Sequence, residues 1–252
     1  MRTARILIIA GSDSGGGAGI QADIKTVTML GGHAMTAITA ITAQNTMGVQ
    51  HVLPLPLDIV AAQVRSVTSD IGVDAVKIGM LGTAELVDTV AGLLRELPAG
   101  VPVVFDPVLV ATSGDPLSAG GTAAAMRAIL PLSALVTPNL PELEALGGEA
   151  AILAEAPALL VKGGHGEGAT IADRLLTRDG EIAHWEDARI DTTSTHGTGC
   201  TLASAIATGL GQGLPLNDAI DRARRFVRAA LLAAPGLGHG HGPMGHQAVR
   251  SS

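Results

Sequence analysis

The chain has 252 residues, of which 47% are hydrophobic and 15% are charged, a balance that argues against disorder and allows one large domain with a buried core. The net charge is −7 and the chain has one Trp, two Phe and no Tyr, so neither a basic face nor stacking residues favour a nucleic-acid partner. No apolar run reaches the roughly 18 residues of a membrane span, no signal peptide is recognisable, and a single cysteine cannot form an intrachain disulfide. We therefore expect a cytoplasmic protein with no membrane partner.

Apolar periodicity predicts strands and helices in alternation along the chain. The first half is expected to hold strand 6–10, helix 20–30, strand 35–42, helix 57–69, strand 75–78, helix 83–97 capped by Thr83, and strand 101–105. The second half is expected to hold helix 121–130, strand 134–137, helix 141–146, strand 158–162, a hairpin of 171–177 and 182–185 turning at Asp179-Gly180, and helices 200–211 and 216–232.

This alternation predicts an α/β fold, with a mostly parallel central sheet and helices on both faces. Residues 1–235 are expected to form a single domain, and residues 236–252 a Gly- and His-rich tail that is loop or disordered. Ligands of such folds lie beyond the carboxyl ends of the strands. The Gly-rich and acid-bearing segments follow predicted strands, so we expect them to meet at one edge of the sheet.

The first Gly-rich segment, residues 11–19, follows the first predicted strand. It is not a dinucleotide fingerprint, because Ile20 stands where the last glycine is required, and not a Walker A loop, because Gly17 replaces the lysine. What remains is a wall of small residues that lets the backbone approach a ligand closely. The alternative is a tight connection between a strand and a helix.

The second Gly-rich segment contains Gly197, Thr198 and Gly199 and precedes an Ala-rich helix. Its backbone N–H groups and the helix dipole predict a site for a phosphate or a developing phosphoryl oxyanion, with an ordinary Thr-capped helix start as the alternative. Cys200 lies in the first turn, where a helix dipole lowers a thiol pKa and makes a thiolate accessible near neutral pH. It could then accept a proton from an alcohol, or else be a small packing residue.

Two carboxylates and one lysine also end predicted strands or begin helices. Asp106 and Glu142 are hard oxygen donors beside the predicted phosphate loop and suit Mg²⁺, although each is also a common turn or first-turn residue. Lys162 ends an apolar strand, which predicts an anionic partner such as phosphate. The tail histidines lack the spacing of a zinc site and favour a flap or a plain tail; these are His239, His241 and His246.

Seven segments in this order resemble the hydroxymethylpyrimidine/phosphomethylpyrimidine kinases of thiamine biosynthesis, within the ribokinase-like superfamily. They are residues 10–26 (AGSDSGGGAGIQADIKT), 43–50 (AQNTMGVQ), 77–81 (KIGML), 106–111 (DPVLVA), 137–142 (TPNLPE), 161–165 (VKGGH) and 195–201 (THGTGCT). They run from the first predicted strand to the last helices. The resemblance implies a ribokinase-like three-layer sandwich, a homodimer, and ATP-dependent phosphorylation with Mg²⁺ of a pyrimidine hydroxymethyl group and then of the resulting monophosphate.

The resemblance also implies roles for individual residues. The implied substrate-binding residues are Gly11, Asp23, Gln44, Met80 and Val108. The residues implied for ATP and phosphate are Asn139, Lys162 and Thr195, and those for the metal are Asp106 and Glu142. Cys200 is implied as the base, beside Gly197, Thr198 and Gly199. An amide and a carboxylate suit an aminopyrimidine edge, which presents an exocyclic amine and ring nitrogens.

The chain departs from the family pattern in three places. Thr112 stands where many members have lysine, Ser194-Thr195 replaces a frequent Asn-Thr, and the segment 146–158 is short, which trims a peripheral helix. These departures concern the rim of the nucleotide pocket. Two other functions stay open: a pyridoxal-type kinase, whose substrate also carries a hydroxymethyl group, and a pyrimidine-binding protein without transfer activity.

Overall fold

The computed structural model describes residues 3–111, 113–115, 117–163 and 168–249. Thr112, Gly164 and His165, which the sequence comparison used, lie outside the described residues. Within the described chain, nine strands form one sheet in the order β3-β2-β1-β4-β5-β6-β7-β8-β9. The strands are β1 (Arg5–Asp13), β2 (His33–Asn45), β3 (Gly48–Pro54), β4 (Ala75–Ile78), β5 (Val103–Phe105), β6 (Leu135–Val136), β7 (Leu159–Val161), β8 (Thr170–Thr177) and β9 (Gly180–Ala188).

Six neighbouring strands of the sheet run parallel: β2, β1, β4, β5, β6 and β7. The strands at the two edges are antiparallel to their neighbours, β3 on one side and β8 and β9 on the other. The helices are α1 (Gly19–Met29), α2 (Leu57–Asp70), α3 (Ala84–Arg95), α4 (Thr122–Ala125), α5 (Leu140–Ala145), α6 (Gly148–Leu153), α7 (Thr198–Gly211) and α8 (Leu216–Leu232), with 3-10 helices η1 (Met126–Leu132) and η3 (His246–Ala248). This arrangement confirms the predicted α/β fold with a mostly parallel sheet.

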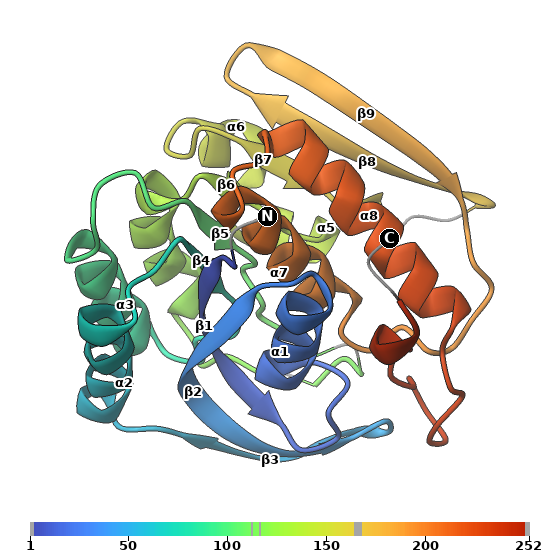
Figure 1. Ribbon diagram of the computed structural model, residues 1–252, viewed down its shortest axis with the longest axis horizontal. Helices are drawn as coiled ribbons and strands as arrows, with labels where there is room; N and C mark the ends of the chain where they lie inside the picture. The colour runs from blue at the N-terminus through green and yellow to red at the C-terminus, as the bar shows by residue number, and fades with distance from the viewer. Residues whose placement is uncertain (1–2, 112, 116, 164–167, 250–252) are drawn as a thin grey trace.

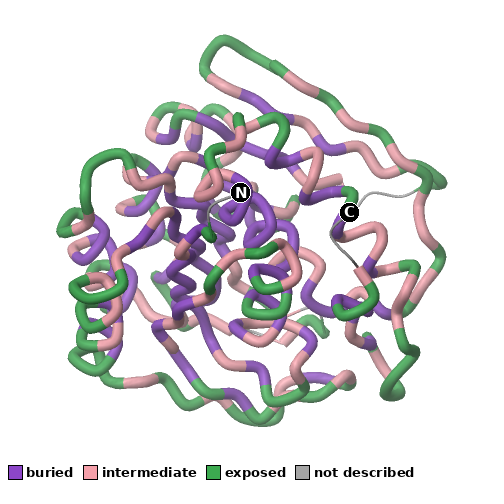
Figure 2. The backbone as a smooth tube through the Cα atoms, viewed as in Figure 1, coloured by how far each residue is buried: buried purple, intermediate pink, exposed green. Residues whose placement is uncertain are grey.

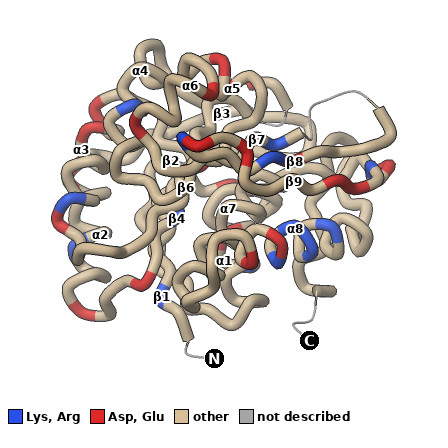
Figure 3. Tube along the Cα trace, turned by 90° about the horizontal axis from the view of Figure 1, so that it is seen from above, with Lys and Arg blue, Asp and Glu red and all other residues tan. Residues whose placement is uncertain are grey.

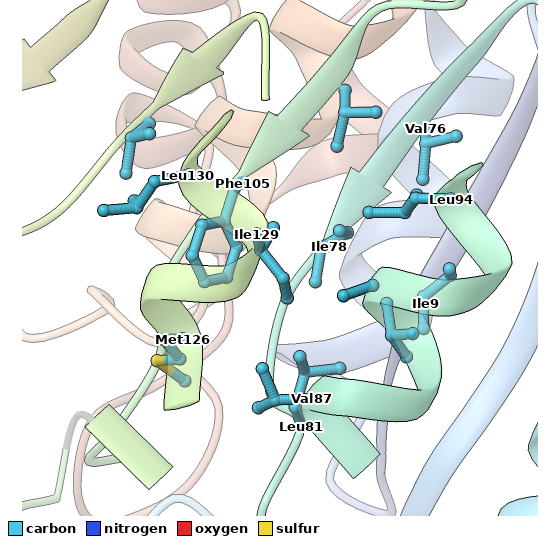
Figure 4. Close-up of a cluster of buried hydrophobic side chains, with 14 of the residues drawn as sticks. Ile9, Val76, Ile78, Leu81, Val87, Leu94, Phe105, Met126, Ile129 and Leu130 are labelled. Atoms are coloured by element: carbon cyan, nitrogen blue, oxygen red, sulfur yellow. The ribbon is translucent and has the colours of Figure 1, made fainter. Parts of the chain in front are cut away.

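Two separate apolar cores make the fold three layers thick. Side chains alternate across each strand, so Leu7 and Ile9 join the core under α2, α3 and η1, whereas Ile6 and Ile8 join the core under α1, α7 and α8. Figure 4 shows the first core, in which Phe105 of β5 packs beside Ile129 and Leu130 of η1. The two helical layers flank the sheet in Figure 1, and Figure 2 shows that the edge strand β9 is exposed along much of its length.

Most predicted elements are confirmed, including the Thr83 cap, whose side chain accepts a hydrogen bond from the Leu86 N–H. Two predictions were wrong in detail. The strand β3 was missed, and the helix predicted over residues 121–130 is a short α-helix followed by a 3-10 helix that contains Pro131. The short segment 146–158 holds a helix of six residues, α6. Among the described residues, no helix has the length and apolarity needed to cross a membrane.

The described part of the tail is loop, one of the two predicted alternatives, apart from the 3-10 helix η3. Its described residues, 236–249, lie against the body of the protein and hydrogen-bond to the β2–β3 turn and to the segment before α7. His246 is 1% exposed and begins η3, which packs against α1 and α8. The described part of the tail therefore packs on the domain formed by the preceding residues. Its backbone joins two regions that are about 150 residues apart in the sequence.

Candidate active site

The start of α7 lies so close to the first Gly-rich segment that Gly197 has no room for a side chain. Gly197, the N-cap, has a φ of 81°, which favours glycine, and a Cβ built there would lie 2.0 Å from the Gly17 carbonyl oxygen. The two Gly-rich segments therefore touch directly, as expected from their positions after strands on one sheet edge. Thr198 is the first residue of α7, and its N–H donates to the Thr195 carbonyl at 3.3 Å, so this N–H is already engaged.

The first Gly-rich segment is organised by Asp13, a residue that sequence reasoning did not select. Its buried carboxylate accepts hydrogen bonds from the N–H groups of Gly15, Gly17 and Ala18 at 2.8–2.9 Å. Burial alone would raise the pKa of Asp13, but the hydrogen bonds from His196 and the backbone hold that pKa below its usual value. Asp13 thus consumes the N–H groups that might otherwise bind an anion, and the segment forms a wall.

His196 connects this wall to the second Gly-rich segment. Its Nε2 lies 2.9 Å from Asp13 Oδ2 and 3.4 Å from Gln44 Nε2, and its ring leaves no room for a side chain at Gly17. Sequence reasoning missed His196 because its partner Asp13 is 183 residues away. The only available signal was its place inside the motif at residues 195–201.

Three of the residues implied for substrate, Gly11, Met80 and Gln44, lie around this wall. A Cβ at Gly11 would lie 3.1 Å from Met80 Sδ, so these two residues are neighbours. The β1–β2 register shifts next to Gly11, and the β2–β3 register shifts at Gln44, an irregularity that re-aims side chains at strand ends. Val108 is half-buried directly after β5. The Gln44 Oε1 accepts a hydrogen bond from the Thr42 hydroxyl at 3.1 Å.

Asp23 occupies a different environment from the one implied by the resemblance. Its carboxylate is fully buried, with Lys77 Nζ of β4 at 2.9 Å from Oδ2 and the Ser204 hydroxyl of α7 donating to Oδ1 at 2.7 Å. Burial alone would lower the pKa of Lys77, but the Asp23 carboxylate more than offsets this effect and raises that pKa. Both carboxylate oxygens of Asp23 therefore have protein partners, Lys77 on Oδ2 and Ser204 on Oδ1, and its substrate contact stays a prediction.

Asp106 and Lys162 meet beside the first turn of α7. Lys162 Nζ lies 2.8 Å from Asp106 Oδ1, which also accepts a hydrogen bond from the Thr137 hydroxyl at 3.2 Å. A Cβ at Gly199 would lie 3.3 Å from Lys162 Nζ and 3.5 Å from Asp106 Oδ2. The structure therefore brings the predicted anion cradle, the predicted phosphate lysine and one predicted metal ligand to a single place.

Glu142 and Asn139 form a capping box at the start of α5. The Asn139 side chain accepts from the Glu142 N–H at 2.9 Å, and Glu142 Oε2 accepts from the Asn139 N–H at 2.8 Å. Burial raises the pKa of Glu142 to about 7, although Lys162 opposes the shift. Among the described residues, no group of three or more His, Cys, Asp or Glu could hold a metal. Such a sparse set of carboxylates fits Mg²⁺, which keeps waters and substrate phosphates as its other ligands.

Cys200 is half-buried in the first turn of α7 and is a free thiol. Burial raises its pKa to about 11, and the nearby positive charge of Lys77 opposes this shift without cancelling it. The prediction of a thiolate accessible near neutral pH is therefore wrong in direction, because desolvation raises the pKa of Cys200 more than the charge of Lys77 lowers it. Thr195, also implied at the phosphate side, has its hydroxyl 3.1 Å from His241 Nδ1 in the tail.

Comparison with known proteins agrees with this geometry. Residues 13–245 match the family described as phosphomethylpyrimidine kinase. The chain belongs to this family. A hydroxymethylpyrimidine/phosphomethylpyrimidine kinase of Streptomyces coelicolor is 49% identical over 96% of this chain and 93% of its own, and one of Haemophilus influenzae is 42% identical over 97% of each.

Solved structures give the same fold. The pyridoxal kinase of Bacillus subtilis, solved as an ADP complex, aligns with a TM-score of 0.87 at 34% identity and covers 98% of both chains. The phosphomethylpyrimidine kinase of Clostridium difficile 630 aligns with a TM-score of 0.76 at 34% identity, over 90% of this chain and 98% of its own. These neighbours confirm the ribokinase-like fold and a kinase active on small molecules.

Proposed function

We propose that this chain transfers the γ-phosphoryl group of ATP to the hydroxymethyl group of 4-amino-5-hydroxymethyl-2-methylpyrimidine, and then to the resulting monophosphate. The observation that carries the proposal is the meeting of the α7 amino terminus with Lys162 and Asp106 around Gly199. A helix amino terminus and a lysine both stabilise negative charge as it develops on a transferring phosphoryl group. Membership of the kinase family supports the same reaction.

The nucleotide side of the site consists of α7, Lys162 and the start of α5. We assign the backbone N–H groups of Gly197 and Gly199, on either side of Thr198, to the transferring phosphoryl group, with Lys162 beside it, and Asn139 and Thr195 to the rim. Asp106 and Glu142 would hold Mg²⁺, which supplies neutralisation of phosphate charge and alignment of the phosphate oxygens. Binding of this ion would require Glu142 to lose a proton that its raised pKa retains in part at neutral pH.

The alcohol side of the site consists of Gly11, Gln44, Met80 and Val108. The Gln44 amide both donates and accepts hydrogen bonds, which suits the aminopyrimidine edge, and Met80 offers an adaptable apolar surface for the ring. Asp23 takes no part in this contact in our proposal. It instead joins α1 to β4 and α7, through its bonds to Lys77 and Ser204, and so holds these elements in place behind the site.

Cys200 is proposed as the base that receives the proton of the alcohol. A loose phosphoryl-transfer transition state requires that proton to leave late, so a small thiolate fraction can suffice. Because burial raises the pKa of Cys200 to about 11, a base role predicts that kcat/KM rises about tenfold per pH unit up to that pH and levels off above it. A plateau of kcat/KM below pH 8 would contradict the base role.

The experiment that tests the proposal is a substrate panel with ATP and Mg²⁺, in which both phosphorylations of the pyrimidine are followed by mass. Pyridoxal belongs in the panel, because the high TM-score to a pyridoxal kinase favours it as a second candidate substrate. The expected result is a higher kcat/KM on the pyrimidine than on pyridoxal. A higher kcat/KM on pyridoxal would contradict the pyrimidine proposal. Tight binding of the pyrimidine without phosphorylation would instead identify a binding protein.

We also propose, from the family resemblance, that the protein is a homodimer and resides in the cytoplasm. Analytical ultracentrifugation of the purified chain checks the first proposal, with a sedimenting mass of about twice 25.3 kDa expected. A single species of monomer mass at micromolar concentration would contradict it. Fractionation of the source cells checks the second.

A further inference from the structure

The segment of residues 237–246, called here the C-terminal strap, lies against the turn between β2 and β3. Three successive N–H groups of the strap point at one residue, Thr46. His239 and Gly240 donate to the Thr46 hydroxyl at 3.2 and 3.3 Å, and His241 donates to the Thr46 carbonyl at 2.8 Å. In Figure 1 the strap is the red segment between α8 and the end of the chain. Thr46 follows Gln44 by two residues, so the strap holds the turn next to a proposed substrate contact on β2.

The alternating glycines of the strap are required by this close approach. A Cβ at Gly240 would lie 2.0 Å from the Thr46 carbonyl oxygen, and one at Gly238 would lie 2.3 Å from the Thr46 hydroxyl. Gly238 also has a φ of +85°, which favours glycine. A Cβ at Gly242 would lie 2.9 Å from the Ser194 hydroxyl. The sequence pattern GHGHG thus gives a backbone that fits between two loops.

The other side of the strap holds the segment that leads into α7. The Gly242 N–H donates to the Thr193 carbonyl, and the His196 N–H donates to the Gly242 carbonyl, both at 3.2 Å. At the end of the strap, the buried His246 is hydrogen-bonded through Nε2 to the Thr201 hydroxyl at 2.8 Å. Thr201 is the next residue after Cys200. The strap therefore reaches the first turn of the proposed anion cradle.

These contacts make one continuous connection between the two sides of the site. It runs from Thr46 through the strap to His196, whose ring returns to Asp13 and lies 3.4 Å from the Gln44 amide. Within the described residues, the end of the β2–β3 hairpin is also held by Asp115, which accepts a hydrogen bond from the Val49 N–H at 2.9 Å, and by Ser14, whose hydroxyl accepts from the Gln44 N–H and donates to the Gln44 carbonyl, both at 2.8 Å. A shift of either the turn or the α7 segment would thus be transmitted through the strap to the other.

We propose that the C-terminal strap is a positioning element that couples binding of the alcohol substrate to binding of the nucleotide. The proposal rests on the proposed kinase function and adds an account of how the two subsites communicate. A ligand that fixes the α7 segment also fixes the β2–β3 turn through the strap, so the second ligand loses less conformational entropy. Coupling of this kind is reciprocal and is measured as a ratio of binding constants.

The test compares Gly240→Ala with Gly120→Ala by titration calorimetry of the full chain. Gly120 has nothing within 4 Å of a built Cβ and an ordinary φ, so it is the matched control. The titrant is the alcohol that the wild type phosphorylates in the substrate panel. It is titrated into the protein alone and into the protein with Mg²⁺ and AMP-PCP, an ATP analogue that does not transfer its γ-phosphoryl group. This choice keeps failure of the pyrimidine assignment distinguishable from failure of the coupling proposal.

In the wild type and in Gly120→Ala, AMP-PCP is expected to tighten alcohol binding by about fivefold or more, a typical size for coupling between two sites. In Gly240→Ala the ratio is expected to fall to near one, and the KM of the alcohol to rise about tenfold. An unchanged ratio in Gly240→Ala would overturn the proposal. So would a wild type in which AMP-PCP has no effect on alcohol binding.

A milder pair of variants keeps the proposal testable if Gly240→Ala fails to fold. Thr46→Ala removes the hydroxyl that accepts from His239 and Gly240 but keeps the carbonyl that accepts from His241. Thr46→Ser restores the hydroxyl. The coupling ratio is expected to fall at least twofold in Thr46→Ala and to return in Thr46→Ser, a rescue that a general loss of stability would not follow. Equal ratios in both variants would also overturn the proposal.

Discussion

Replacing Lys77 by methionine would leave the Asp23 carboxylate in the interior without its counter-ion. Both side chains are fully buried, and their charged atoms lie 2.9 Å apart. Methionine has a similar length to the lysine stem and no charge, so the change creates little empty space. The main effect is electrostatic, and the Ser204 hydroxyl is the hydrogen-bond donor that stays on Asp23.

The expected magnitude follows from this burial. Breaking one side of a buried ion pair costs about 3–5 kcal/mol, because the remaining charge is neither solvated nor paired. Since a domain is stable by only about 5–15 kcal/mol, this loss is a large share of the free energy of unfolding. Adding Asp23→Asn to Lys77→Met removes the unpaired charge, and the double variant is expected to recover more than half of the loss.

The assay is equilibrium unfolding in urea at pH 7 and 25 °C, with the midpoint and slope compared among wild type, single and double variants. Arg65→Met is the control, because Arg65 forms an exposed ion pair with Glu96 and its loss is expected to leave the midpoint unchanged. If Lys77→Met lost less than about 1 kcal/mol, or if the double variant were no more stable than the single one, the reasoning about the buried pair would be refuted.

Three further variants test other parts of the site. Cys200→Ala is expected to lower kcat about 100-fold or more in steady-state kinetics with the alcohol KM within about twofold, and an unchanged kcat would remove the thiol from its base role. Burial is the main reason that the pKa of His246 is lowered to about 4 in the folded protein, from about 6.5 in the unfolded chain. Between these two pH values the unfolded chain binds a proton at His246 and the folded protein does not, so the free energy of unfolding decreases as pH falls from 6.5 to 4. In urea unfolding at pH 7.5 and pH 4.5, the decrease in the free energy of unfolding between the two pH values should be smaller in His246→Gln than in the wild type, by up to about 3 kcal/mol. The same decrease in both proteins would contradict the lowered pKa. Arg224→Met should raise the KM of ATP and lower the Tm by several degrees, because Asp173, which accepts from the Gly163 N–H beside Lys162, loses its buried partner. Arg225→Met, on the same basic helix α8 in Figure 3 but exposed, should change neither.

The sequence predicted the order of elements well, because each strand of the parallel sheet is a short apolar run and each helix repeats its apolar residues every three to four positions. It missed β3, a half-polar edge strand that ends in Pro54 and lacks a continuous apolar run. It extended the 121–130 helix through a region whose second part is 3-10, where Pro131 cannot continue an α-helical ladder.

The candidate site was predictable where residues follow strands and less so where partners are distant in the chain. Asp106, Lys162 and Gly199 meet as expected, because the carboxyl ends of parallel strands share one edge. The burial of Asp23 depends on Lys77, 54 residues further on, and no local pattern indicates that pairing. A lysine inside the short apolar strand β4 was the available signal, since such a residue requires a buried partner.

The direct contact of Gly197 with Gly17 has a consequence for redesigning this enzyme. The floor of the site is main chain pressed against main chain, so even a single methyl group at either position would force the two loops apart. A library that randomises these loops would consist mostly of inactive clones. Under the proposed function, substrate preference is expected to change instead at the side chains of Gln44, Met80 and Val108, where a new shape can be introduced without moving the backbone of Gly17 and Gly197.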